Sequence, residues 1–346
     1  MDKMKVVVTG GTGYIASWIV RDLLKEGHEV RITVRKLKDK EKYVHLLNLE
    51  KKYEGTLKIF EADLLKAGSF DLAIEGADYV MHTASPFSVD RNLDPRKDLL
   101  EPAVQGTVNV LEAVNRSKTV KRVVLTSSLA AIYGDNRDMH DLGIEAFDET
   151  MWNTTSSLEN NPYSYSKTMA EKKAWEMVGQ QEAWDLVTIH PGFVFGPSLS
   201  KRVDATSIDT LRRLLSGAFR TGVPHLEYVF SDIRDISTGH IRAAFTQEAH
   251  GRYIIANENG SFLKMAKIIK HHYGNKYKLP RRIIPKPVIW AIAPMIGLSR
   301  QYIKNNVGYK LKADNSRSIQ ELKMTYRPLE TTLKDHIEQL RKDGLV

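Results

Sequence analysis

The sequence predicts an α/β fold in which a doubly wound parallel sheet is followed by a smaller and less regular C-terminal lobe. Three observations predict it. A glycine-rich turn at residues 9–13 separates a short apolar run from a segment with helical apolar spacing. Short apolar runs then alternate with helical segments as far as Pro197. Beyond Pro197 the alternation stops, and shorter pieces are interrupted by prolines.

The alternating pattern assigns the elements in order. Strands are predicted over residues 5–8, 29–34, 57–61, 79–83, 123–126, 186–190 and 251–255. Helices are predicted over residues 14–25, 104–116, 164–178 and 333–342. Parallel strands need crossover connections, so this order predicts helices on both faces of one sheet. Residues 1–197, with 230–257 returning to them, are assigned to one domain, and residues 198–346 mostly to a second lobe.

Composition excludes several classes of protein. The chain has 346 residues and no cysteine, which excludes a disulfide framework, a thiolate zinc site and a cysteine nucleophile. The net charge of +9 raises the question of nucleic acid. The basic residues are mostly scattered, with the densest group at 276–286, and aromatic residues are not interleaved with them. We interpret them as a solvated basic face and expect no nucleic-acid partner.

Nothing in the sequence predicts a membrane span. The first residues run directly into a strand and leave no room for a signal peptide, so we expect a cytoplasmic protein. The longest apolar stretch, residues 287–298, contains two prolines and is too short to cross a bilayer. It could contact a membrane surface, but we expect it to pack over the entrance of a substrate pocket.

The glycine turn predicts a dinucleotide site of the Rossmann type. Gly10 and Gly13 allow the backbone to approach a pyrophosphate, and Ala16 is small enough for close packing of helix on sheet. The N-terminus of the following helix supplies amide donors and the positive end of its dipole. We therefore assign cofactor contacts to this turn and the start of the helix. The residues are Thr9, Gly10, Thr12, Gly13, Tyr14 and Ile15.

The end of the second strand indicates which cofactor binds. Folds that bind NAD usually place an acidic residue there, against the ribose 2′-hydroxyl. This chain has Arg35 and Lys36 instead, followed by Lys38, Lys40 and Lys42. A guanidinium binds a 2′-phosphate that a carboxylate would repel. The sequence thus favours NADPH, with Arg35 and Lys42 as contacts.

Tyr163 and Lys167 form the predicted catalytic pair. They are four residues apart in a helical segment and so share one face. A neighbouring cation lowers the pKa of a phenol, which is about 10 when unperturbed. We therefore expect Tyr163 to exchange a proton with a carbonyl or an alcohol near neutral pH.

Several motifs resemble those of extended short-chain dehydrogenases/reductases, in the same order along the chain. Besides the glycine turn and the Tyr163/Lys167 pair, they are 62–64, 82–87, 125–128, 190–197 and 232–235. The sequence is most similar to the branch that contains dihydroflavonol 4-reductase, cinnamoyl-CoA reductase and the fungal methylglyoxal and ketone reductases. The resemblance covers nearly the whole chain.

The resemblance implies a role for each matching residue. Asp63 and Leu64 would edge the adenine, and Thr83, Ala84 and Ser85 would contact the middle of the cofactor. Ser128 would hydrogen-bond the substrate carbonyl, Tyr163 would protonate it, and Lys167 would bind the nicotinamide ribose. Pro191 and Val194 would pack at the nicotinamide.

Two departures from related patterns bear on the substrate. Sugar-nucleotide epimerases carry Asn-Val-x-Gly-Thr where this chain begins with Ala103, which favours the reductase branch. Plant flavonoid reductases tend to have an asparagine in the stretch that matches residues 129–133, which has none here. Phe87 and Tyr133 instead suggest an apolar pocket with aromatic walls.

The leading hypothesis is an NADPH-dependent aldehyde or ketone reductase that acts on a small hydrophobic carbonyl compound. A hydroxysteroid-type alcohol dehydrogenase is the alternative, and the basic cofactor loop argues against it. A non-catalytic dinucleotide-binding redox sensor is a third possibility, but such a protein would be expected to lose Tyr163 and Lys167. His271 and His272 are adjacent and diverge on a helix, so no metal site is expected. Both a monomer and a homodimer are compatible with the sequence.

Overall fold

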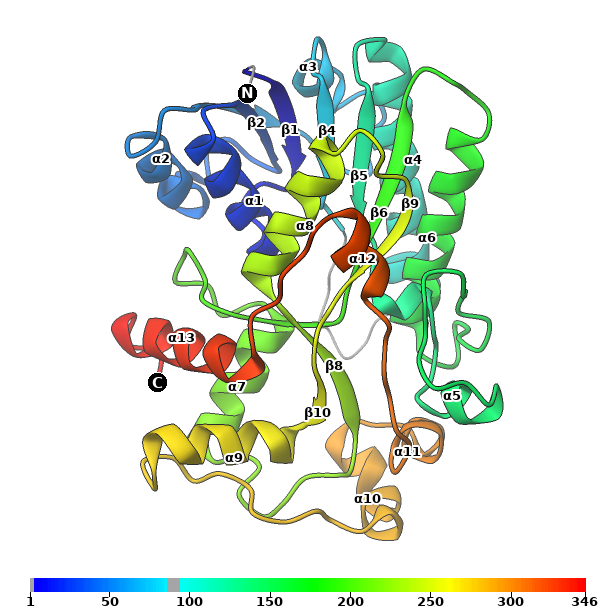
Figure 1. Ribbon diagram of the computed structural model, residues 1–346, viewed down its shortest axis with the longest axis vertical. Helices are drawn as coiled ribbons and strands as arrows, with labels where there is room; N and C mark the ends of the chain where they lie inside the picture. The colour runs from blue at the N-terminus through cyan, green and yellow to red at the C-terminus, as the bar shows by residue number, and fades with distance from the viewer. Residues whose placement is uncertain (1–2, 86–93) are drawn as a thin grey trace.

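A computed structural model describes residues 3–85 and 94–346. Its centre is a seven-stranded sheet in the order β3-β2-β1-β4-β5-β6-β9, and every neighbouring pair is parallel (Figure 1). The strands are β1 (Lys5–Thr9), β2 (Glu29–Val34), β3 (Thr56–Glu61), β4 (Tyr79–His82), β5 (Arg122–Thr126), β6 (Asp185–Pro191) and β9 (Gly251–Ile255). The predicted doubly wound sheet is confirmed, and its strand order reverses between β1 and β4, where such folds bind ligands.

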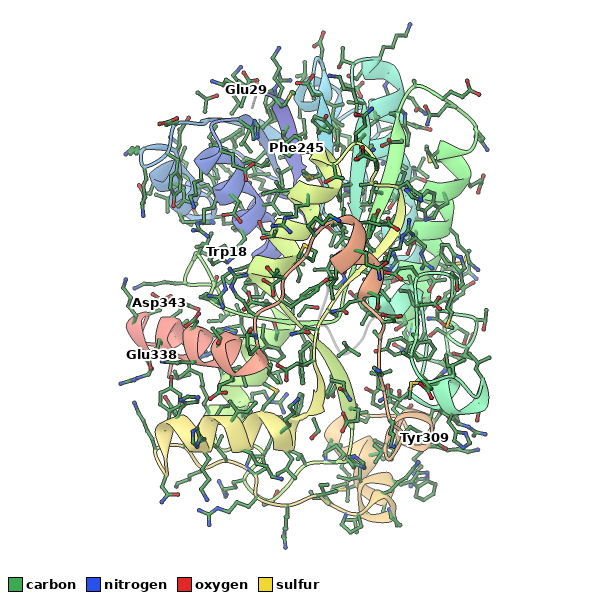
Figure 2. The ribbon with its side chains drawn as sticks, in the orientation of Figure 1. Trp18, Glu29, Phe245, Tyr309, Glu338 and Asp343 are labelled. Carbon is green, nitrogen blue, oxygen red and sulfur yellow. The ribbon has the colours of Figure 1, made fainter. Side chains whose placement is uncertain are left out.

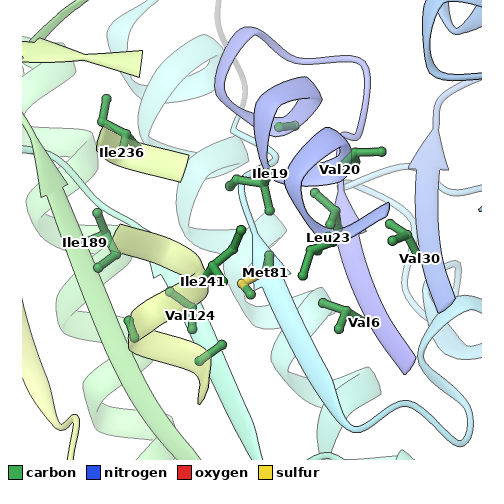
Figure 3. Close-up of a cluster of buried hydrophobic side chains, with 14 of the residues drawn as sticks. Val6, Ile19, Val20, Leu23, Val30, Met81, Val124, Ile189, Ile236 and Ile241 are labelled. Atoms are coloured by element: carbon green, nitrogen blue, oxygen red, sulfur yellow. The ribbon is translucent and has the colours of Figure 1, made fainter. Parts of the chain in front are cut away.

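Helices cover both faces of this sheet. One face carries α1 (Tyr14–Lys25) and α8 (Ile233–Phe245), whose apolar side chains form a buried cluster with the strands (Figure 3). Val6, Ile19, Leu23 and Ile236 belong to this cluster and are fully buried. The other face is covered by α3 (Asp71–Ile74), α4 (Glu101–Ser117) and α6 (Pro162–Val178). α2 (Val44–Glu50) packs beside α1 at the β3 edge.

A second, smaller sheet follows the central one. It has the order β10-β8-β7, with β7 (Phe193–Phe195) parallel to β8 (Glu227–Asp232) and β10 (Asn259–Ser261) antiparallel to it. Its helices are α7 (Thr206–Ser216), α9 (Phe262–Tyr273), α10 (Lys286–Ile292), α11 (Arg300–Asn306) and α13 (Leu329–Lys342). α5 (Arg137–Asp141) and α12 (Ser316–Glu321) are short connections. Figure 1 shows α9, α10 and α11 at the end of the molecule away from α2 and α3.

The strands of the second sheet could not be predicted from the sequence after Pro197. β7 and β10 have three residues each, which is too short for an alternating apolar pattern to be recognised. β8 pairs with β7, a strand that lies more than thirty residues earlier in the chain, and a local sequence pattern does not reveal this pairing. Within the described residues no helix is long and apolar enough to cross a bilayer, and no cluster of potential metal ligands is found.

Candidate active site

The glycine turn after β1 lies tightly against its neighbours. Gly10 has a φ of +63°, which favours glycine, and a Cβ there would lie 3.1 Å from Ala84. A Cβ on Gly11 would lie only 2.5 Å from the Cβ of Ile32 in β2. The sequence predicts that Gly10 and Gly13 let the backbone approach a pyrophosphate. The structure adds Gly11, which must lack a side chain for the turn to pack on β2.

Thr9 joins the ends of β1 and β4. Its side chain is buried, and its hydroxyl oxygen accepts hydrogen bonds from the backbone N–H groups of Thr83 and Ala84, both at 3.1 Å. The Thr83 hydroxyl in turn donates to the Thr9 carbonyl at 2.5 Å. Thr9 is predicted from the sequence to contact the cofactor, whereas its side chain is engaged in these hydrogen bonds. Thr9 thereby holds residues 83–85 beside the glycine turn.

The turn opens into a groove of about 580 Å³, a volume within the range of ligand pockets. Twelve of the predicted cofactor residues line it: Gly10, Thr12, Gly13, Tyr14, Ile15, Arg35, Lys42, Leu64, Thr83, Ala84, Ser85 and Val194. α1 begins at this groove with Gly13 as its N-cap and without a side-chain cap. Its first amides therefore remain available to a bound anion.

The β2 end of the groove is basic. Arg35 is exposed and lines it together with Lys36. Lys42 also lines it, but its ammonium forms an ion pair with Asp39 at 2.9 Å. Arg35 is thus better placed than Lys42 to bind a phosphate.

Asp63 does not line the groove as the structure describes it. Its carboxylate accepts a hydrogen bond from the backbone N–H of Leu65 at 2.9 Å, which forms a turn of its own. The neighbouring Leu64 does line the groove. Of the predicted adenine contacts, the structure therefore brings Leu64 to the groove and leaves Asp63 outside it.

The groove also contains residues that sequence reasoning missed. Arg202 lies in the segment after β7 and donates to the Thr12 carbonyl at 3.1 Å. It forms an ion pair with Asp204 at 2.8 Å, and Asp204 lines the groove as well. The Trp18 indole anchors this segment by donating to the Pro197 carbonyl at 2.8 Å. Figure 2 labels Trp18 among the side chains of the molecule. Arg202 is far from the glycine turn in sequence and gives no local pattern that could have identified it.

Tyr163 and Ser128 meet at the start of α6. Ser128 caps the short 3₁₀ helix Leu129–Ala131 by accepting from the Ala130 N–H at 3.1 Å. Tyr163 is 41% exposed as a residue, and desolvation raises the pKa of its hydroxyl above the ordinary 10. The side chain of Ser128 lowers the pKa and so offsets part of that rise. The structure differs here from the expected lowering by Lys167, and Tyr163 remains protonated at neutral pH.

Lys167 lies one turn further along the same helix. Its ammonium donates to the Thr126 carbonyl at 3.2 Å, at the end of β5. Burial lowers the pKa of Lys167 to about 8, and the negative charge of Glu171 partly opposes this shift. A cavity of about 20 Å³, large enough for about one water molecule, is lined by both Lys167 and Glu171. Lys167 can therefore lose its charge in mildly alkaline solution.

Glu171 is the centre of a buried polar cluster that sequence reasoning also missed. Its side chain is 1% exposed, and the Arg252 guanidinium, the His190 ring and two hydroxyl groups surround it. The distances to its carboxylate are 2.8 Å from Arg252, 3.3 Å from His190, 2.5 Å from Ser127 and 3.2 Å from Thr188. Burial alone would raise the pKa of Glu171, but His190 and Arg252 outweigh it and hold the pKa well below its usual range.

This cluster contacts the backbone of Ser128, the serine that the resemblance assigns to catalysis. His190 Nδ1 lies 3.0 Å from the carbonyl oxygen of Ser128, so the cluster reaches the backbone of that residue. Arg252 also donates to the Glu149 carbonyl at 2.8 Å and stacks 3.9 Å from the Trp152 ring centre. Glu171 is four residues after Lys167, and this spacing was the only sequence signal for its position.

Of the two predicted substrate residues, the structure describes Tyr133 but not Phe87. Tyr133 stacks on Phe147 with ring centres 4.8 Å apart, and burial raises the pKa of its hydroxyl. Phe87 lies outside the described residues. Pro191 is buried at the end of β6, while Val194 in β7 lines the groove.

Comparisons with known proteins agree with this arrangement. The model of the NAD dependent epimerase/dehydratase family matches residues 6–256. A cinnamoyl-CoA reductase of Medicago truncatula is 35% identical over 342 residues, which are 97% of this chain and 95% of the relative. Tetraketide alpha-pyrone reductase 1 of Arabidopsis thaliana is 34% identical over 345 residues, or 99% and 97% of the two chains.

A solved structure extends the similarity to the fold. Yeast methylglyoxal/isovaleraldehyde reductase Gre2 complexed with NADPH has a TM-score of 0.80 at 26% identity, with 99% of this chain and all of that chain covered. The resemblance found in the sequence is therefore confirmed. The chain belongs to the NAD dependent epimerase/dehydratase family of extended short-chain dehydrogenases/reductases, and the relatives named here are reductases.

Proposed function

We propose that the protein reduces an aldehyde or ketone to the alcohol with NADPH, and that Tyr163 donates the proton. The observation that carries the proposal is the placement of Tyr163 and Lys167 one turn apart on α6, with Ser128 near enough to Tyr163 to affect its pKa and a long groove leading from the glycine turn. A protonated phenol beside a hydroxyl group is the arrangement that reduction of a carbonyl requires.

The groove fits NADPH. The glycine turn and the uncapped N-terminus of α1 supply amide donors for the pyrophosphate, and Arg35 supplies a guanidinium for the 2′-phosphate. Gre2, which has a similar fold, was solved with NADPH. We assign cofactor binding to residues 1–197 and 230–257, and substrate binding mostly to residues 198–346.

The chemistry that bound NADPH would supply is transfer of a hydride to the carbonyl carbon, with its own oxidation to NADP⁺. Ser128 hydrogen-bonds the carbonyl oxygen and holds it near the Tyr163 hydroxyl. As negative charge develops on that oxygen, Tyr163 transfers its proton to it, and solvent reprotonates the phenolate. The raised pKa of Tyr163 keeps the phenol in the form that donates. Lys167 holds the nicotinamide ribose and stabilises the transient phenolate by its charge.

We propose small or medium hydrophobic aldehydes and ketones as substrates. Tyr133, five residues after Ser128, is half-buried and stacks on the buried Phe147, so its ring can form an aromatic wall. Two of the similar proteins are a methylglyoxal/isovaleraldehyde reductase and a cinnamoyl-CoA reductase.

A screen of NADPH oxidation across aromatic aldehydes, diketones, α-ketoesters and flavanonols tests the proposal. We expect turnover with at least one hydrophobic carbonyl compound and little with NADH. Activity on a sugar nucleotide with none on any simple carbonyl compound would refute it. Faster oxidation of hydroxysteroids with NADP⁺ than reduction of any carbonyl would favour the alcohol dehydrogenase instead.

A further inference from the structure

The positive charge of the protein is concentrated in one segment. Between Glu258 and Asp314 the chain has no acidic residue, and it has twelve basic ones. They are Lys264, Lys267, Lys270, Lys276, Lys278, Arg281, Arg282, Lys286, Arg300, Lys304, Lys310 and Lys312. The rest of the chain contains the other 39 basic residues and all 42 acidic ones. The net charge of +9 therefore comes from this segment, which contains the densest basic group at residues 276–286, while most of the basic residues are scattered over the rest of the chain.

Large apolar side chains are exposed in the same segment. Trp290 is 44% exposed and Met295 is 86% exposed, and Ile283, Val288 and Ile296 are also exposed. Only the inner side of this region is packed: Ile289 and Ala293 are buried against Ile303 and Val307. The expectation that residues 287–298 cover a substrate entrance does not account for the outer side chains.

The charged and apolar groups occupy one end of the molecule. Figure 1 shows the chain between α9 and α10 running along that end, with α10 and α11 beside it. The Arg300 guanidinium lies 4.5 Å from the Trp290 ring centre, so the two kinds of group are in direct contact. We call residues 276–304 the basic apolar surface. Among the described residues of this surface, no Lys or Arg forms an ion pair within 4.0 Å.

The chemistry of this surface selects its partner. A second copy would place like charges against each other. A nucleic acid would match the charge but would leave the exposed aliphatic side chains in water. An anionic bilayer matches both, because its headgroups attract Lys and Arg while Trp and aliphatic side chains enter the interface.

We propose that the basic apolar surface binds the headgroup region of an anionic phospholipid membrane. Trp290, Met295 and Ile296 insert at the interface, and the surrounding Lys and Arg side chains extend to the phosphates and carboxylates of the lipids. The contact is peripheral and does not involve the groove or Tyr163, so it is independent of the reaction.

Co-sedimentation of the full chain with vesicles tests this proposal. We expect binding to vesicles that contain phosphatidylserine, little binding to phosphatidylcholine alone, and release at high salt. Lys278→Glu/Arg281→Glu is expected to weaken binding about tenfold or more, because each basic residue near the surface contributes to attraction. The control variant Lys51→Glu/Lys52→Glu makes the same change in charge at two exposed residues that follow α2. It is expected to bind the vesicles as strongly as wild type does.

A second pair of variants tests the apolar part. Trp290→Ser/Met295→Ser is expected to reduce vesicle binding, whereas Leu72→Ser, at an exposed leucine in α3, is not. NADPH-dependent turnover must be unchanged in each variant, which shows that it is folded. Three results would overturn the proposal: equal binding to neutral vesicles, binding to heparin but not to vesicles, or a dimer that the serine variant disrupts without any vesicle binding.

Discussion

The two ends of the candidate site are built differently. At the β2 end, Arg35 and Lys36 are exposed and line an open groove. At the α6 end, Ser128 and Lys167 lie beside a buried cluster centred on Glu171, which is 1% exposed and contacts Arg252 and His190. The open end can select a cofactor by charge at little cost to folding. The closed end couples the position of the reacting groups to the stability of the core.

Substitutions at the two ends are therefore expected to affect different properties of the protein. Changes at the open end should alter cofactor affinity and leave stability unchanged, because an exposed side chain loses little on replacement. Changes beneath the closed end should alter stability and the pH dependence together, because Glu171 and Lys167 interact through burial and charge.

The largest effect is expected for Tyr163→Phe, which removes the proposed proton donor and keeps the ring. Turnover should fall by about 10² to 10⁴, while NADPH affinity changes little. Lys167→Ala should lower both, and Ser128→Ala should lower turnover with less effect on NADPH affinity. Steady-state kinetics and NADPH fluorescence titration measure the two quantities. Loss of NADPH affinity in Tyr163→Phe would contradict the assigned role.

Glu171→Gln is expected to destabilise the protein by about 3–5 kcal/mol at neutral pH, because it leaves the buried Arg252 without a charged partner. The folded pKa of Glu171 is depressed, so its contribution is complete above the ordinary 4.5 and is lost as the pH falls toward the folded pKa. Urea unfolding at several pH values should therefore show the variants converging in acid. Glu176→Gln, an exposed position on the same helix, is the control. Equal stability of Glu171→Gln and wild type would refute the role of the cluster.

Arg35→Asp is expected to weaken NADPH binding by about ten- to a thousandfold, because it replaces a charge-assisted contact with repulsion. The affinity for NADH should change much less. Lys38→Asp makes the same change in charge in the same loop, outside the residues that line the groove, and should have a smaller effect. Tighter binding of NADH than NADPH by the wild type would show that Arg35 does not select the cofactor.

The alkaline limb of kcat/KM tests the link between Lys167 and Glu171. We expect the rate of reduction to fall as the pH rises through about 8, where Lys167 loses its proton. Because Glu171 raises the pKa of Lys167, Glu171→Gln should move this midpoint to lower pH. A midpoint that stays in place would show that the two groups are not coupled.

Tyr165→Phe should be nearly silent. Tyr165 is two residues from Tyr163 and therefore points to a different face of α6. The turnover and the midpoint of thermal unfolding of the Tyr165→Phe variant are expected to match those of wild type. If Tyr165→Phe abolished turnover and Tyr163→Phe did not, the assigned face of the helix would be wrong.

The sequence predicts well what depends on local pattern. The glycine turn, the strands of the central sheet and the Tyr163/Lys167 spacing each lie within a few residues, and the structure places the sheet as expected. Arg202 and Arg252 could not be predicted, because each acts through contacts with residues distant in the chain, Thr12 and Glu171. The pKa of Tyr163 was predicted in the wrong direction because spacing shows the neighbouring cation but not the desolvation.

Transfer of deuterium from NADPH labelled at the reacting carbon of the nicotinamide tests the central claim most directly. We predict that the product alcohol carries the label on its carbinol carbon when the best carbonyl substrate of the screen is reduced. Wild type should transfer one label for each NADPH oxidised, and Tyr163→Phe should do so at a rate lower by about 10² to 10⁴. An unlabelled alcohol, or equal rates for the two proteins, would contradict it.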